Sequence, residues 1–284
     1  MNIRINGQEA NIQVETEKTV GEILAGLEQW LENSGHRLSG MTIDGELINS
    51  GSIEASFCRN IDSISTLDII TSSLQELTIE GLTHVLEDIE EYENLDFDGK
   101  QRYAVLWEES PAARLLAGEI PELFTWITQT FSGEGLSPQA LRPAVEERLR
   151  EIQDPMNELG KTEPIIAGIC VRLEELPLDI QTGKDARAAE TLSFFSAIAG
   201  KFFRIFNLLK VMGFPLAEIK VEEKPVAEYI SEFSAALREI VTAYEQRDTV
   251  LVGDLAEYEL SPRLRNLSAA LLHTGSVAVP VQDA

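Results

Sequence analysis

The chain has 284 residues, of which 44% are hydrophobic, and its 48 Asp and Glu against 23 Lys and Arg give a net charge of −25. This length suits one large domain or two of ordinary size, and the apolar content is that of a globular protein. Because a strongly anionic protein repels other polyanions, nucleic acid and anionic membrane surfaces are poor candidate partners. No run approaches the ~18 uninterrupted apolar residues that a membrane-spanning helix needs, so no membrane insertion is expected.

The two cysteines and the start of the chain bear on its compartment. Cys58 and Cys170 stand too far apart in the sequence to suggest a disulfide framework or a metal-ligand spacing, and we expect both to be reduced and buried. The chain opens directly into a strand pattern, without a basic region followed by an apolar stretch. We therefore expect no secretory signal and predict a cytoplasmic protein.

The first residues predict an antiparallel hairpin. Met1 to Ile5 alternates apolar and polar residues, Asn6-Gly7 is a strong signal for a two-residue turn, and Ala10 to Val14 alternates again. A helix should follow, with Thr19 as its cap and Glu22 as the acid of a capping box. Its apolar residues follow helical spacing and predict one broad buried face: Val20, Ile23, Leu24, Leu27, Trp30 and Leu31.

Three further strands complete this region. Leu38 to Ile43 reads as a strand, Asp44-Gly45 as a tight turn, Leu47-Ile48 as a short return strand and Leu67 to Thr71 as a last strand. The order resembles that of ubiquitin-like β-grasp domains, over about a quarter of the chain. The landmarks that carry the resemblance are Val14-Glu15, Thr19-Val20, Ile43-Asp44-Gly45 before Leu47, and Asn60-Ile61 before Ser65-Thr66-Leu67.

The resemblance implies a β-grasp domain over residues 1–72, with two departures that matter for function. The positions that form an apolar recognition patch in that family are here Thr42, Asp68 and Ile70, so most of the patch is missing. In place of a di-glycine tail, Ser72-Ser73 leads into a helix start, which argues against conjugation and sulfur-carrier chemistry. We expect a docking module instead, with Arg4, Thr42 and Ile70 as candidate contact residues.

Helical periodicity dominates residues 73–273, and breaks in it predict seven to nine helices. The fold class expected is therefore α+β, a β-grasp domain followed by a mainly α-helical bundle domain, with room for two sub-bundles divided near residues 155–183. The final residues 274–284 are small and uncapped, and we expect them to be disordered. The breaks are expected at 94–99, Pro111, 133–138, Asp154-Pro155, Pro164, Pro177, 213–215, Lys224-Pro225 and Arg247-Asp248.

The most apolar piece is Asp185 to Met212, which carries two lines of large side chains. Such a helix is normally central to a bundle, and the rival interpretation is that part of its Phe-rich surface faces a partner. Lys201, Arg204 and Lys210 should pair with nearby carboxylates. The first line is Phe195, Ile198, Phe202, Ile205, Leu209 and Met212, and the second is Leu192, Ala199, Phe203 and Phe206.

A search for chemistry finds no complete site. Asn94, Asp96, Asp98 and Gly99 resemble the start of a calcium loop, but Val105 stands where that loop needs a bidentate Glu, so we expect a turn with an Asp cap. The three histidines are scattered, and nucleophile elbows, phosphate loops and zinc motifs are missing from the sequence. We therefore expect no enzyme activity, no cofactor and no bound metal.

Two functions remain open at this point. The first is a non-enzymatic adaptor or scaffold that binds protein partners through the β-grasp module and through the helical domain. The alternative is a cytoplasmic chaperone that holds an amphipathic segment of an exported or self-assembling subunit, with the Phe-rich helix lining a groove. On the helical domain, the candidate contact residues are Phe194, Phe202 and Phe206.

Overall fold

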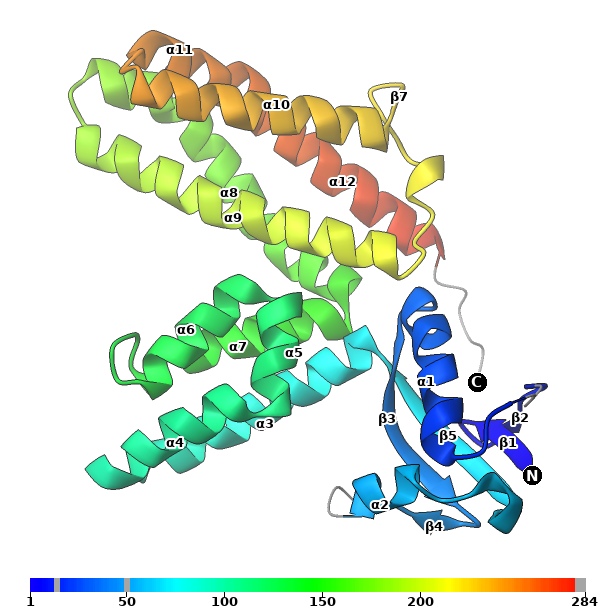
Figure 1. Cartoon of the computed structure of the whole chain (residues 1–284). Helices are drawn as coiled ribbons and strands as arrows, with labels where there is room; N and C mark the ends of the chain where they lie inside the picture. The colour runs from blue at the N-terminus through cyan, green and yellow to red at the C-terminus, as the bar shows by residue number, and fades with distance from the viewer. Residues whose placement is uncertain (13–15, 49–51, 279–284) are drawn as a thin grey trace, which may run out of the picture. The chain divides into compact units, whose positions relative to one another are not determined.

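The protein is described here from a computed structural model that covers residues 1–12, 16–48 and 52–278. It is an α+β protein in which a small mixed sheet is followed by helices (Figure 1). Contacts divide the chain into two compact units, residues 1–146 and 147–284. The boundary lies inside helix α7 (Pro138–Gln153) and not in the range 155–183 expected from the sequence, because helix α8 (Pro155–Gln181) crosses that range unbroken.

The sheet has five strands in the order β2-β1-β5-β3-β4. β1 pairs in parallel with β5, whereas the other neighbours are antiparallel. The helix α1 (Val20–Asn33) packs against β3, and a two-residue turn joins each outer pair of strands. The strands are β1 (Asn2–Ile5), β2 (Gln8–Glu9), β3 (His36–Ile43), β4 (Glu46–Leu47) and β5 (Thr66–Ser73).

Both predicted hairpin turns are confirmed. Asn6 and Gly7 have φ angles of 49° and 78°, and Asp44 and Gly45 have 52° and 88°, the left-handed values that a tight hairpin between twisted strands requires. The second strand is shorter and earlier than predicted, because Gln8 and Glu9 pair directly with β1 after the turn. The end of the predicted strand Ala10–Val14 lies outside the described residues.

The core of the sheet region joins one face of the sheet to one face of α1. Ile3, Leu67 and Ile69 of the sheet are buried against Val20 and Ile23 of the helix. The predicted capping box is present, since the Glu22 carboxylate accepts from the Thr19 backbone N–H and the Thr19 hydroxyl accepts from the Glu22 N–H, each at 3.3 Å. The prediction that Trp30 lies on the buried face of the helix is wrong, because its side chain is 55% exposed.

A short helix, α2 (Ile53–Phe57), and a 3₁₀ turn, η2 (Ile61–Ser63), precede β5. Cys58 is the C-cap of α2, and the expectation that it is buried is wrong: it is exposed at this helix end, where its backbone N–H bonds to the Ser56 carbonyl. Cys170 is buried as expected, and both thiols are free.

A capping box starts the helical part of the first unit. The Ser73 hydroxyl accepts from the Glu76 N–H at 3.1 Å, while the Glu76 carboxylate accepts from the Ser73 N–H at 2.7 Å. Tyr92, Trp107 and Phe131 then build an aromatic core, in which the Tyr92 hydroxyl donates to the Phe131 carbonyl at 3.0 Å. The helices are α3 (Leu74–Glu93), α4 (Phe97–Glu109), α5 (Pro111–Glu119), α6 (Pro121–Phe131) and the first part of α7.

The second unit is built from four long helical runs that lie side by side (Figure 1). A π-helical segment, η4 (Leu255–Leu260), joins α11 to α12 without a break, so the described residues after Ser73 form nine separate α-helical runs. The remaining elements are α9 (Asp185–Val211), η3 (Leu216–Glu218), β6 (Lys220–Val221), β7 (Lys224–Pro225), α10 (Val226–Glu245), α11 (Thr249–Asp254) and α12 (Ser261–Ala278).

Most predicted breaks coincide with helix ends, but two do not. Pro164 and Pro177 lie inside α8, so the predictions of a break at each of them are wrong. Thr162 and Leu173 are fully or almost fully buried, and burial of this kind on α8 stabilises a helix that its proline content alone disfavours. The predicted disorder is also wrong for residues 274–278, which belong to α12, whereas residues 279–284 lie outside the described residues.

Helix α9 buries one side in the core of the second unit, but α8 is the helix that contacts most of the other helices of this unit, so the prediction that α9 is central is wrong. Phe195, Phe202 and Ile205 are at most 3% exposed and pack with α8, α10 and α12 in one continuous core. In the described residues, α9 is also the one helix whose length and composition would allow it to cross a membrane, a property that buried core helices share. Met212, expected to continue the buried line, follows the last residue of α9 and is 49% exposed.

Candidate protein-binding groove

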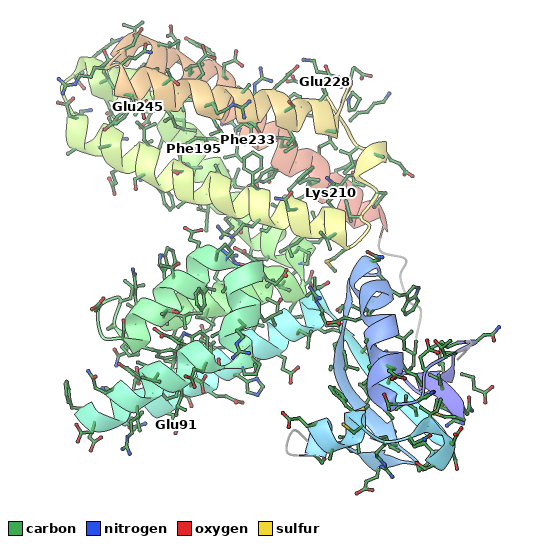
Figure 2. All side chains as sticks on the ribbon, viewed as in Figure 1. Glu91, Phe195, Lys210, Glu228, Phe233 and Glu245 are labelled. Carbon is green, nitrogen blue, oxygen red and sulfur yellow. The ribbon has the colours of Figure 1, made fainter. Side chains whose placement is uncertain are left out.

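An apolar groove lies between α9 and α10 in the second unit. Its volume is about 800 Å³, and its walls come from successive turns of both helices. Figure 2 shows Phe195 and Phe233 in the space between the two helices and Glu245 at the end of α10. The groove is lined by Ala189, Leu192, Ser193, Phe195, Ser196, Ala199, Gly200 and Phe203 of α9 and by Leu237, Ile240, Val241, Tyr244 and Glu245 of α10.

The groove has a closed end and an open end. Phe203 and Phe233 stack with their ring centroids 5.6 Å apart and an interplanar angle of 12°, which brings α9 and α10 together at one end. At the other end, a second hollow of about 470 Å³ shares Ala189, Leu192 and Tyr244 with the groove. The hollow extends past the first turn of α9 and is lined there by Asp185 and Arg247.

The two rims of the groove differ in chemistry. On α9, small residues at helical spacing form a low rim: Ala189, Ser193, Ser196 and Gly200. On α10, Val241 and Tyr244 are 57% and 58% exposed and form a high apolar rim. Glu245 is the one charged residue among the described residues that line the groove. Apolar walls with few polar groups are typical of sites that bind an apolar ligand surface.

A buried ionic cluster joins the side of α9 that faces away from the groove to the end of α7 and the start of α8. The Arg204 guanidinium donates to both carboxylate oxygens of Glu151, at 3.0 and 2.8 Å, and the Lys201 ammonium donates to Glu158 at 2.8 Å. Glu151 is fully buried and Glu158 is 4% exposed. The expectation that Lys201 and Arg204 pair with carboxylates is confirmed, and the cluster holds α9 in place while its other side lines the groove.

The charge state of Glu158 follows from its neighbours. Burial alone would raise the pKa of this carboxyl, but the hydrogen bond and the positive charge of Lys201, with Arg150 nearby, hold the pKa below its ordinary value. The carboxylate therefore stays ionised at neutral pH, and the pair with Lys201 persists there.

The candidate residues on α9 are divided between core and surface. Phe202 and Phe206 are 1% and 8% exposed, so the prediction that they offer an accessible surface is wrong. Phe194 is 40% exposed, but it does not line the groove. The groove is lined instead by Leu192, Ala199 and Phe203 of the second apolar line and by Phe195 of the first. Sequence spacing separates the two lines but does not show which of their residues a neighbouring helix covers.

The candidate residues of the sheet share its face away from the core. Arg4 and Thr42 both pair with Asp68, so these three residues form one row across β1, β5 and β3. Ile70 lies two positions further along β5, beside Gly40. Each of these four side chains is partly exposed; the row itself is polar, and Ile70 beside it is apolar.

No cluster of three or more His, Cys, Asp or Glu side chains that could hold a metal ion occurs in residues 1–12, 16–48 and 52–278. Asp96 caps α4 by accepting from the Gly99 N–H at 2.8 Å, the role expected for it. Burial raises the pKa of the Cys170 thiol, which opposes its ionisation.

The fold and the groove define an α+β protein with a surface suited to an apolar ligand. Residues 1–73 match a protein-family model described as the TP0873 N-terminal domain, and residues 157–270 match a domain of unknown function, DUF8042. The chain is also similar to an uncharacterized protein of Treponema pallidum (strain Nichols), with 23% identity over 273 residues that cover 96% of this chain and 97% of the relative. No solved structure matches.

Proposed function

We propose that this chain is a non-enzymatic protein-binding protein whose second unit holds a segment of a partner in the groove between α9 and α10. The observation that supports this proposal is the groove itself, with a floor of Phe195, Ala199 and Ile240 and walls rich in aliphatic and aromatic side chains. A groove lined mainly by apolar side chains of two helices is a common receptor for an amphipathic helix of a partner.

The sheet region supports a second contact. The strand order β2-β1-β5-β3-β4, the parallel pair β1 and β5 and a helix packed on one face support the proposal that residues 1–72 form a β-grasp domain. We propose that the face with Arg4, Thr42 and Ile70 docks a protein partner, so that the whole chain acts as an adaptor. A polar row of this kind favours a hydrogen-bonded contact over an apolar one.

The chaperone alternative rests on the same groove. Helix-in-groove binding, in which an amphipathic helix lays its apolar face between two helices, is a recurrent way to protect such a segment. An adaptor would keep its partner bound during function, whereas a chaperone would release it before assembly. A cytoplasmic location, proposed from the sequence, suits either role.

Peptide display on the full-length chain tests the proposal. Peptides enriched on the native chain should lose binding to the variant Ser196→Trp, because an indole at this exposed rim position would fill the groove. The control is Ala197→Trp, an exposed neighbour on the same helix that does not line the groove. Circular dichroism should show that both variants keep the native helix content.

Each outcome of the peptide display either supports or contradicts the groove as the binding site. Loss of binding in Ser196→Trp with retention in Ala197→Trp supports the groove as the binding site. Enriched peptides that bind both variants as well as the native chain would show that they bind elsewhere. Failure of any peptide to be enriched on the native chain would contradict a protein-binding role for this unit.

A further inference from the structure

The geometry points to one kind of occupant: we propose that the groove binds a single amphipathic α-helix whose polar face is positively charged. This inference rests on the proposed function and specifies the partner of the same site. Three properties of the groove lead to it, namely its length, its low rim on α9 and the charge of the chain around it.

The length of the groove matches a helix of moderate size. Its lining on α9 runs from Ala189 to Phe203, which at about 1.5 Å per residue is about 21 Å. A partner helix of about 15 residues lying along this path could place apolar side chains at i, i+3, i+4 and i+7 into the groove. The stacked Phe203 and Phe233 close one end, so a longer helix would extend over the hollow beside Asp185 and Arg247.

The low rim distinguishes a helix from a narrower ligand. Ala189, Ser193, Ser196 and Gly200 follow one side of α9, and small residues at this spacing let a second helix backbone come close to the first. The high rim on α10, with Val241 and Tyr244, would then cover the far side of the bound helix. An extended acyl chain would leave most of the space above the low rim empty, so shape favours a helix.

The negative charge of the protein favours a partner helix whose exposed face is positively charged. Residues 147–284, the unit that holds the groove, carry 22 acidic and 15 basic residues and so a net charge of −7, and Glu245 is the charged residue that lines the groove. Electrostatic complementarity across an interface speeds association and rejects partners of like charge. A second copy of this chain would bring its own net charge of −25, which opposes self-association through this face. A helix with Lys or Arg on its exposed face would be attracted both by Glu245 and by the net negative charge of this unit.

Fluorescence anisotropy with three synthetic peptides of about 15 residues tests the inference. The first peptide has a Leu stripe at helical spacing and Lys elsewhere, the second has Glu in place of Lys, and the third has the composition of the first in scrambled order. The full-length chain should bind the Lys peptide at least about tenfold more tightly than either of the others. The variant Glu245→Lys should weaken this binding about threefold to tenfold, whereas Glu239→Lys, an exposed α10 residue outside the groove, should not.

The results also separate this inference from the proposed function. If the Lys and Glu peptides bind equally and both lose binding in Ser196→Trp, the groove is a protein-binding site but the charge preference is refuted. If the scrambled peptide binds as tightly as the Lys peptide, a helical occupant is refuted. If the Lys peptide binds Ser196→Trp and the native chain equally, the groove itself fails as the site. A dimer in sedimentation equilibrium that Ser196→Trp dissociates would identify a second copy as the occupant and overturn the inference.

Discussion

At the scale of single residues, the stability of the second unit depends on carboxylates that are buried in its interior. Glu151 contacts Arg204 through two hydrogen bonds and Arg148 at 3.1 Å, while its own side chain is fully buried. A buried ion pair is costly to form, but removal of one partner leaves a buried charge without compensation. The value of this cluster therefore lies in fixing where α9 packs against α7.

Replacement of Glu151 by Gln should lower the free energy of unfolding by about 3 to 5 kcal/mol, because Arg204 and Arg148 would lose the charge that compensates them. Urea denaturation followed by circular dichroism measures the change. The matched control is Glu147→Gln, since Glu147 is 40% exposed and lies 3.4 Å from Lys201 and 3.7 Å from Arg204. The control should cost less than about 1 kcal/mol. An equal loss in both variants would contradict the role given to burial.

Stability should also depend on the ionisation of Glu158. Its pKa is lower in the folded chain than the ordinary value of 4.5, so the unfolded chain binds more protons between these two values. The stabilisation by this carboxylate is complete above pH 4.5 and is lost as the pH falls through its folded pKa. We expect the difference in stability between the native chain and Glu158→Gln to shrink as the pH falls from 7 toward 3, as measured by urea titration. A constant difference would show that ionisation of Glu158 is not responsible.

At the scale of elements, α9 shows how far the sequence predicts the site. The periodicity of its large side chains correctly predicts a buried side, but it does not show that α8 is the helix at the centre of the unit. Adjacent residues nevertheless have different roles, since Phe202 is buried in the core while Phe203 lines the groove. The position of α10 decides this difference. It is a tertiary property that arises from contacts distant in sequence, so the pattern within α9 could not reveal it.

The prolines of α8 also show that local sequence does not predict which tertiary contacts a helix makes. Pro164 and Pro177 predict helix ends from local sterics, yet the helix continues through both because its buried face packs on α9 and α12. Gly253 of α11 lies so close to Pro177 that an added Cβ would be 3.2 Å from the proline Cβ. The proline is thus part of a close helix crossing that the sequence of α8 alone does not indicate.

Two glycine substitutions test this crossing. Gly168→Ala on α8 should stabilise the chain by about 0.5 to 1 kcal/mol, because an added methyl group meets open space and alanine favours the helix. Gly253→Ala has the same helical preference but forces a contact with the rigid proline ring, so it should give no gain or a loss of about 1 kcal/mol. Thermal denaturation measures both. Equal stabilisation by the two substitutions would show that α8 and α11 can separate without cost.

At the scale of the whole molecule, charge is distributed unevenly. Residues 1–146 hold 26 acidic and 8 basic residues, a net charge of −18, whereas residues 147–284 hold 22 and 15, a net charge of −7. The sequence alone yields this count, and the α+β class with its order of sheet and helices also follows from the sequence pattern. The boundary between the units does not, because α7 continues through it without a glycine or a loop to mark it.

The uneven charge predicts how salt acts on the chain. In the first unit, exposed carboxylates such as Glu87 and Glu91 repel one another along α3, and salt screens exposed charges that lie about 10 Å apart at 0.1 M. Raising NaCl from about 0.02 M to about 0.5 M should therefore raise the melting temperature of the native chain. The combined variant Glu87→Gln and Glu91→Gln should start from a higher melting temperature and respond less to salt. Differential scanning calorimetry measures both effects, and a native chain that melts earlier in high salt would show that its ion pairs outweigh the repulsion among its surplus carboxylates.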